Sequence, residues 1–413
     1  MPDTKAAHRR KSFGAFQHRG FLFYWLSRLC ATFAVNMVSV SVGWQVYDLT
    51  RDPFDLGLIG LVQFLPALLL VLVTGSVADR FNRRMIMALC LAGEAFAVMA
   101  LLAFTISGSE MVVIVFGILL FFGIVRAFMG PASQSLAPNL VPTQDLASAI
   151  AWNSSAWQIA TIVGPVAGGL LYGISPEAPY AVALAMMIIG AILILLVPKP
   201  AQKILGDKAS WETVIAGFRY VWKEKIVLGA ISLDLFAVLL GGATALMPIF
   251  ARDILDVGPW GLGLLRAAPA VGALTVAAWL AFHPIRNHAG LLLFAFVTMF
   301  GLTTIVFGLS TLVWVSVVAL VLMGASDMVS VYIRETLIQL WTPDAVRGRV
   351  NAVNMVFVGA SNELGEFRAG MSAAVFGAVS AVVIGGAGTV AVAALWARFF
   401  PDLRRARHLD GRP

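Results

Sequence analysis

Long apolar runs recur along the whole sequence, and each is long enough to cross the hydrocarbon core of a membrane. A membrane-spanning helix needs about 20 mostly apolar residues. Only 12% of the residues are charged, whereas a soluble domain averages roughly 25%. The sequence predicts about twelve spans. They cover residues 21–47, 54–79, 85–106, 111–133, 146–172, 179–197, 226–250, 259–282, 289–309, 312–334, 347–376 and 378–399.

The spans are expected to be helices, because backbone polar groups find no water partners inside hydrocarbon. The short alternating segments of an outer-membrane barrel are absent from the sequence. The fold expected is therefore all-α and integral to the membrane, with twelve transmembrane helices.

Lys and Arg gather in the tails, in the central linker and in the loops of one side, while the opposite side has little beyond Arg51 and Arg252. The positive-inside rule then places both termini in the cytoplasm of a multi-pass inner-membrane protein. The net charge of +7 is a topological signal. Because these charges are dispersed over loops, no nucleic-acid partner is expected.

The two halves of the sequence repeat each other. A spacing of roughly 200 residues relates Gly123 to Gly324 and Gly164 to Gly365, which indicates two parallel six-helix bundles. The expected parts are a tail (1–20), an N-terminal bundle (21–197), a linker with an amphipathic helix (198–225), a C-terminal bundle (226–399) and a second tail (400–413).

The loop between the second and third spans reads GSVADRFNRR. It resembles the G-x-L-x-D-R-x-G-R-R motif of the major facilitator superfamily. The matching residues are Gly75, Asp79, Arg80, Arg83 and Arg84. The resemblance implies an inner gate, in which Asp79 bridges helix ends and the arginines hold the loop at the cytoplasmic face. Alternatively, the arginines only set topology. Asn82 replaces the usual Gly, and Asn tolerates a positive φ.

Two further motifs lie in the N-terminal half. Arg126 and Gly130 resemble the family's R-x-x-x-G pattern, and an arginine inside hydrocarbon should face a cavity or a partner. GPVAGG resembles the antiporter motif of the superfamily and implies export. Its residues are Gly164, Pro165, Gly168 and Gly169. Close helix packing explains the glycines equally well.

In the C-terminal half, Asp327 occupies the position equivalent to Arg126, and the two could pair in one state of the transport cycle. Glu363 and Glu366, in the string SNELGEFRAG, share a helix face. This string resembles a subgroup with siderophore and macrolide-type drug exporters. A carboxylate removed from water can cycle a proton, so these three acids, with Arg126, are the candidates for proton coupling. The alternative is a local pair of a glutamate with Arg368.

Other polar residues within spans are candidates to line a substrate cavity or to bond between helices. The cavity candidates are Arg28, Asn36, Gln63, Arg126, Asn153, Asp234 and Asp327. Glu94 is a weaker candidate, because the third span is usually peripheral in this fold.

The function expected is export of an amphipathic small molecule, siderophore-like or drug-like, by proton antiport with alternating access. No nucleotide-binding loop, metal-ligand cluster or nucleophile–base pair is apparent in the sequence, so no cofactor, metal or enzymatic activity is expected. The expected partners are the substrate, protons and the bilayer, and the expected state is a monomer. The alternatives are a translocator of lysophospholipid or a related amphiphile, and a transport-inactive sensor or scaffold.

Overall fold

The structure is a computed structural model that describes residues 14–199, 218–285 and 287–406. In these ranges every regular element is a helix, which confirms the all-α fold. Both chain ends, residue 286 and residues 200–217 lie outside the described residues. Most of the amphipathic helix predicted in the linker is therefore outside the described residues as well.

The chain divides into two compact units. The first unit comprises Met1–Gln45 and Val62–Ala209, and the second comprises Val46–Leu61 and Ser210–Pro413. Residues 46–61 come from the N-terminal sequence repeat but group with the second unit.

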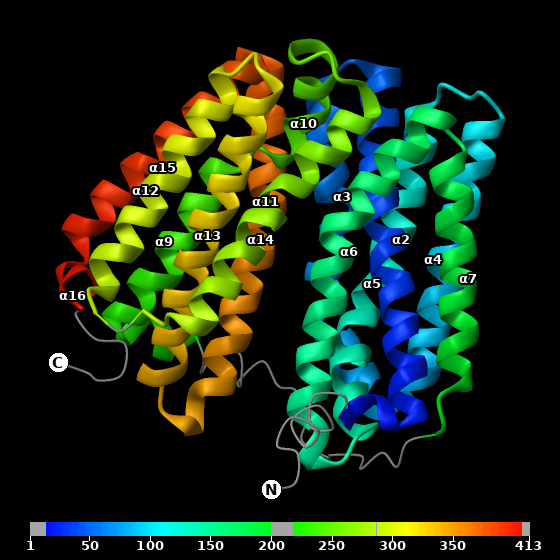
Figure 1. Cartoon of the computed structure of the whole chain (residues 1–413), viewed down its shortest axis with the longest axis horizontal. Helices are drawn as coiled ribbons and strands as arrows, with labels where there is room; N and C mark the ends of the chain where they lie inside the picture. The colour runs from blue at the N-terminus through cyan, green and yellow to red at the C-terminus, as the bar shows by residue number, and fades with distance from the viewer. Residues whose placement is uncertain (1–13, 200–217, 286, 407–413) are drawn as a thin grey trace, which may run out of the picture. The chain divides into compact units, whose positions relative to one another are not determined.

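Among the described residues, six long helices lie wholly or mostly in the first unit and run side by side in Figure 1. They are α2 (Arg19–Thr50), α3 (Pro53–Arg80), α4 (Arg83–Ile106), α5 (Val112–Leu136), α6 (Leu146–Ile174) and α7 (Ala178–Leu196). Helix α4 packs against both α5 and α7. The core beneath this contact is apolar, with Met87, Leu91, Leu136 and Ile194 fully buried.

In the described part of the second unit there are a further six long helices. They are α9 (Lys225–Gly241), α11 (Gly258–Phe282), α12 (Ala289–Leu309), α13 (Val313–Trp341), α14 (Asp344–Phe376) and α15 (Ala378–Phe399). Helix α12 packs against both α13 and α15, and α11 packs against α13. A short helix, α16 (Pro401–Arg405), follows α15.

Eleven helical segments among the described residues are long and apolar enough to cross a membrane. Helix α14 is not one of them, although it is 33 residues long, because Arg347, Arg349, Glu363, Glu366 and Arg368 lower its hydropathy. Eleven of the twelve predicted spans each coincide with one long helix, α14 among them, and the seventh is the exception.

The seventh span, predicted as continuous over 226–250, is interrupted. Helix α9 ends at Gly241, and the chain continues through the short helices η4 (Thr244–Leu246) and α10 (Met247–Ile249) into a π-helical turn, η5 (Phe250–Ile254). Two adjacent glycines weaken the helix at this point. A side chain at Gly242 would lie 3.1 Å from the carbonyl carbon of Gly365, so the break also allows α14 to approach closely.

The sequence repeat is visible in the packing of each unit. In the first unit Gly123 of α5 lies against the backbone of Gln63 in α3, where an added Cβ would be 2.9 Å from Cα. In the second unit the equivalent Gly324 of α13 lies against the carbonyl group of Pro269 in α11. Glycine at both positions permits backbone contact between neighbouring helices.

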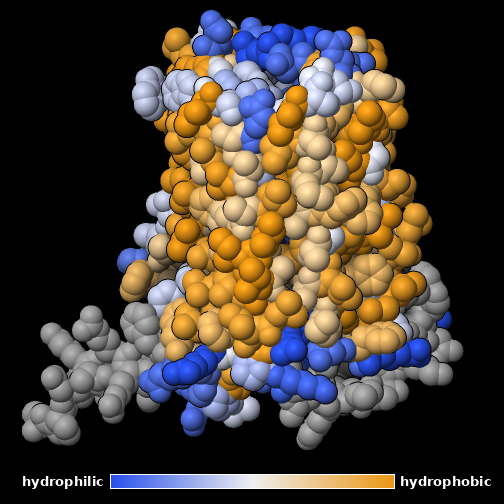
Figure 2. Space-filling model, turned by 90° about the vertical axis from the view of Figure 1, so that its right-hand side faces the viewer, coloured by the Kyte–Doolittle hydropathy of each residue, from blue (hydrophilic) through white to orange (hydrophobic). Residues whose placement is uncertain are grey.

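The side of α4 and α7 carries a broad hydrophobic band, with hydrophilic residues gathered at its two ends (Figure 2). Leu89 and Phe96 of α4 and Ile192 of α7 are among the large apolar residues exposed there. Such a band matches the surface that a membrane-spanning bundle presents to lipid.

Candidate functional site

The loop that carries the predicted inner gate is tied to the ends of two helices of its own unit. Arg83 donates from Nη1 to the carbonyl oxygen of Ser135 in α5, at 2.9 Å. Arg84 donates from Nη1 to the carbonyl oxygen of Val197, which follows α7, at 2.6 Å. Cations at helix C-termini complement both the free carbonyl groups and the helix dipole. The two arginines therefore fix the loop beneath the bundle.

Asp79 and Arg80 remain accessible. The Asp79 carboxylate lies 3.8 Å from Nη2 of Arg83, and 44% of its side chain is exposed. Arg80 is exposed, and Gly75 has no heavy atom within 4 Å of the position that a Cβ would take. The loop thus presents one carboxylate and one arginine outward, and both could change partners.

Asn82 does not use the tolerance of Asn for a positive φ. Asn82 has φ −64° and ψ 110°, and its side chain accepts a hydrogen bond from the backbone N–H of Arg84. The distance is 3.1 Å. Asn82 is the N-cap of α4, a position that favours Asn for its side-chain acceptor.

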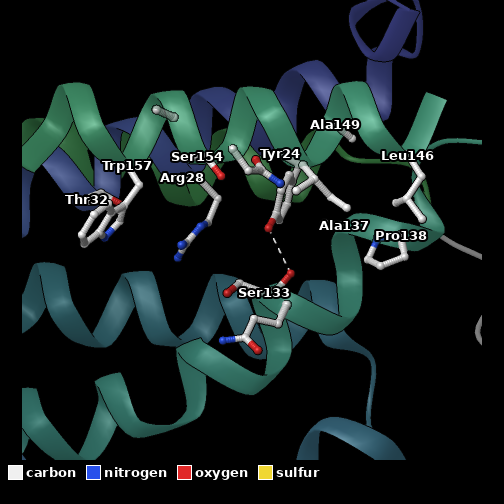
Figure 3. A pocket seen from close by; sticks show the side chains of 14 residues that line it. Tyr24, Arg28, Thr32, Ser133, Ala137, Pro138, Leu146, Ala149, Ser154 and Trp157 are labelled. Carbon is white, nitrogen blue, oxygen red and sulfur yellow. Dashed lines mark hydrogen bonds between the residues drawn. The ribbon is translucent and has the colours of Figure 1, made fainter. Parts of the chain in front are cut away.

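The first unit holds a cavity of about 360 Å³ between α2, α5 and α6. Its lining residues are Tyr24, Arg28, Thr32, Ser133, Gln134, Ala137, Pro138, Leu146, Ala149, Ile150, Asn153, Ser154, Ala156 and Trp157. The Tyr24 hydroxyl donates to the carbonyl oxygen of Ser133 at 3.0 Å, and Figure 3 shows the two groups directed toward one another. The same view shows Arg28 directed into the space between the helices. The cavity brings together the predicted cavity residues Arg28 and Asn153.

Arg126 is an exposed residue of α5 and does not line this cavity. Its charge acts on Glu94 of α4, as does the charge of Arg28. The Glu94 side chain is 2% exposed, and its Oε2 has no hydrogen-bond partner. Glu94 is thus a buried carboxyl group with two cations nearby, which the peripheral position of its span did not suggest.

The residues of the GPVAGG string pack α6 against α2. A Cβ at Gly164 would lie 2.7 Å from Cβ of Asn36, and one at Gly168 would lie 2.9 Å from the carbonyl oxygen of Met37. Both Pro165 and Gly169 are buried within α6. The Asn36 amide donates within its own helix, to the carbonyl oxygen of Thr32, at 2.8 Å. This motif therefore provides close helix contact in the structure.

A buried ion pair crosses the second unit. Asp234 of α9 pairs with Arg334 of α13, and their side chains are only 9% and 4% exposed. Asp234 was among the predicted cavity residues, whereas Arg334 was not. Asp327 lies two helical turns before Arg334 and lines a cavity of about 10 Å³ together with Asp234 and Ser330. The structure therefore brings Asp234 and Asp327 to one place.

Glu363 and Glu366 of α14 face α11 and the first part of α3, which groups with the second unit. A Cβ at Gly60 would be 2.7 Å from Oε2 of Glu363 and 3.4 Å from Oε2 of Glu366. The positive charge that acts on both is Arg266 of α11, whose Nε is buried without a hydrogen-bond partner. This cluster contains two acids and one base.

Arg368 serves the broken helix. It donates from Nε to the carbonyl oxygen of Leu239, at 3.0 Å, and from Nη2 to that of Leu240, at 2.5 Å. These are carbonyl groups at the end of α9, and carbonyls without partners are costly inside a membrane. The alternative of a Glu–Arg pair with Arg368 gives way to this capping role.

A second charged cluster of the second unit joins the end of α2 to η5. Asp48 pairs with Arg252. Nη1 of Arg51 lies 3.4 Å from Oδ1 of Asp253. The other carboxylate oxygen of Asp253 accepts a hydrogen bond from the Tyr47 hydroxyl. Arg51 has φ 54°, an uncommon conformation for a residue with a side chain. The sequence showed only two arginines here, without their acidic partners.

Comparison with other proteins identifies the family. The model of the transmembrane secretion effector family matches residues 10–410. The enterobactin exporter EntS of Citrobacter koseri is 25% identical over 405 residues, and the alignment covers 94% of each chain. EntS of Escherichia coli O1:K1 / APEC shows the same identity and coverage.

Solved structures show the same fold. A bacterial homologue of the human lysosomal transporter Spinster, inward-facing and unoccupied, superposes with a TM-score of 0.73 at 16% identity, over 96% of this chain and 98% of the other. A bacterial homologue of the iron transporter ferroportin superposes with a TM-score of 0.68 at 15% identity, over 94% of this chain and 99% of the other. The chain is a multi-pass membrane transporter rather than an enzyme, and it belongs to the transmembrane secretion effector family of the major facilitator superfamily.

Proposed function

We propose that the chain exports an amphipathic small molecule, siderophore-like or drug-like, across the inner membrane. The observation that carries this proposal is the cavity between α2, α5 and α6, where a guanidinium, amides and aromatic rings lie together inside a membrane-spanning bundle. Such a lining suits a molecule with one apolar and one polar part. The curated relatives named enterobactin exporters support export and a siderophore-like substrate.

The proposed driving force is the proton gradient, which is coupled to export by antiport. Carboxylates inside a membrane mark proton relays, because they can exchange a charge for a neutral form. Asp327, Glu363 and Glu366 are the proposed carriers. Glu363 and Glu366 share one basic neighbour, Arg266. Arg126 is the proposed coupling residue of the first unit, and its pairing with Asp327 stays a prediction.

The remaining proposals concern topology and gating. Both termini are placed in the cytoplasm, on the side of the loop that carries Asp79, Arg80, Arg83 and Arg84. The accessible Asp79 then acts as an inner gate that changes partners as the two repeats rock. The carrier is proposed to work as a monomer.

The function can be tested by comparing culture media. A host that expresses the chain is compared with one that lacks it and with one that expresses Asp327→Asn at equal membrane abundance, and all small molecules in the medium are measured. We expect at least one amphipathic metabolite to be enriched outside cells with the wild-type chain. Asp327→Asn is a matched control because the substitution preserves side-chain size while removing the charge.

Other outcomes would contradict the proposal in distinct ways. Equal media with and without the chain would favour a sensor or scaffold, and depletion of a metabolite from the medium of cells with the chain would indicate import. Enrichment of lysophospholipid as the only change would favour the lipid translocator.

A further inference from the structure

The membrane interior of the first unit carries an uncompensated positive charge. Away from the helix ends, its described helices hold three charged residues: Arg28 on α2, Glu94 on α4 and Arg126 on α5. Two cations thus face one carboxylate. Helix α7, which packs against α4, has no charged residue. A net charge inside a membrane is costly unless a partner or water compensates it.

Arg28 is the residue whose charge is open to a ligand. Within the described part of the chain it makes no hydrogen bond and no ion pair within 4 Å, and its interactions are longer-range ones with Tyr24 and Glu94. Of the described residues that line the cavity, Arg28 alone is charged. Its guanidinium is directed into this space (Figure 3). A guanidinium with free donors binds carboxylates and related anions in a two-point geometry.

The rest of the lining suits an aromatic group. The Tyr24 ring is buried and held by its bond to Ser133, whereas Trp157 is 52% exposed and can contact a bound molecule. Asn153 adds an amide whose Oδ1 is shielded and has no hydrogen-bond partner. The cavity volume of about 360 Å³ fits a small aromatic ligand.

We propose that this cavity binds the anionic group of an aromatic amphiphile, with the Arg28 guanidinium as its anchor. The proposal rests on the proposed function, since it assigns a substrate class to the same cavity. It selects Arg28, and not Arg126, as the residue that recognises the negative charge. Export of an anion also draws on the inside-negative membrane potential, which favours its outward movement by roughly 50-fold per charge at 100 mV.

Binding to the purified full chain in detergent tests the proposal. The probes are 2-naphthoate, 2-naphthamide and 2-naphthylmethylammonium, which share one ring system and differ in charge. Titration calorimetry should give an affinity for naphthoate at least tenfold above that for the amide, as a charge-assisted hydrogen bond provides. The ammonium ion should bind more weakly still.

Three variants test which residue causes the preference for the anion. Arg28→Gln should bring the affinities for naphthoate and naphthamide within about threefold of each other, because Gln retains hydrogen bonding without charge. Arg28→Lys should keep a preference for the anion. Arg126→Gln, at a cation outside the cavity, should keep it too.

Several results would overturn the proposal. These are equal or stronger binding of the amide or the ammonium ion by the wild-type chain, no binding of any probe, or loss of the preference in Arg126→Gln but not in Arg28→Gln. If Arg28→Gln does not fold, the wild-type probe series and Arg28→Lys decide. The comparison of culture media uses no added ligand, so export can stand when this proposal fails.

Discussion

Removing one partner of the buried pair between Asp234 and Arg334 should strongly destabilise the second unit. The two side chains are 9% and 4% exposed, and both Nε and Nη1 of Arg334 lack further hydrogen-bond partners. Breaking such a pair leaves an uncompensated buried charge, which costs about 3–5 kcal/mol. For a unit of this size, this corresponds to a fall in Tm of roughly 6–20 °C.

The assay is thermal unfolding of the purified chain in detergent, for Arg334→Met, Asp234→Leu and the double variant. Replacing both charges by apolar groups of similar size is often nearly neutral. The double variant should therefore recover most of the Tm that either single variant loses. Arg51→Met is the matched control, because Arg51 is 50% exposed and its ion pairs should contribute about 0–1 kcal/mol.

The reasoning is refuted if Arg334→Met lowers the Tm no more than Arg51→Met does. It is also refuted if the double variant is less stable than both single variants. In either case Asp234 would not be the main partner of Arg334.

Three further predictions concern single residues. Asp79→Asn should keep the chain folded and inserted but strongly reduce export, because an amide cannot form a charge-assisted bridge; wild-type export at equal abundance would remove the gating role. Asp327, Glu363 and Glu366 can be neutralised one at a time and assayed in liposomes. At least one variant should lose uphill transport while it still exchanges substrate for substrate. If all three variants still concentrate substrate, the proton carrier lies elsewhere. Arg368→Met should destabilise the chain by about 2–6 kcal/mol in thermal unfolding, since two carbonyl groups lose their donors, and an unchanged Tm would contradict the capping role.

The fold could be predicted because the bilayer imposes it directly on the sequence. Each crossing requires a long apolar run, and every one of these runs except the seventh, which is interrupted after Gly241, is a continuous helix in the structure. The repeat could be recognised because close helix contact requires glycine at equivalent places, as at Gly123 and Gly324.

The partners of the polar residues could not be predicted in the same way. Asp234 and Arg334 are far apart in sequence, and only the packing of α9 against α13 brings them together. Glu94 lies on a span expected at the periphery, yet it faces two cations. Hydropathy shows that a charge lies within the membrane but does not show which helix it faces.

Local backbone structure accounts for the remaining differences. The break after Gly241 turns Arg368 from an expected glutamate partner into a cap for α9. Asn82 was expected to replace Gly for its backbone freedom, whereas its side chain caps α4. Both side chains bond to backbone groups. Side-chain charge in the sequence does not predict such contacts.

The central claim is proton-driven export, and accumulation by inverted membrane vesicles tests it most directly. The metabolite identified from culture media is added outside the vesicles, and its uptake into the lumen is followed under an imposed proton gradient. We expect accumulation that collapses on addition of a protonophore and that is absent from vesicles without the chain. Accumulation that survives the protonophore, with a sodium gradient as the only driving force, would contradict proton antiport.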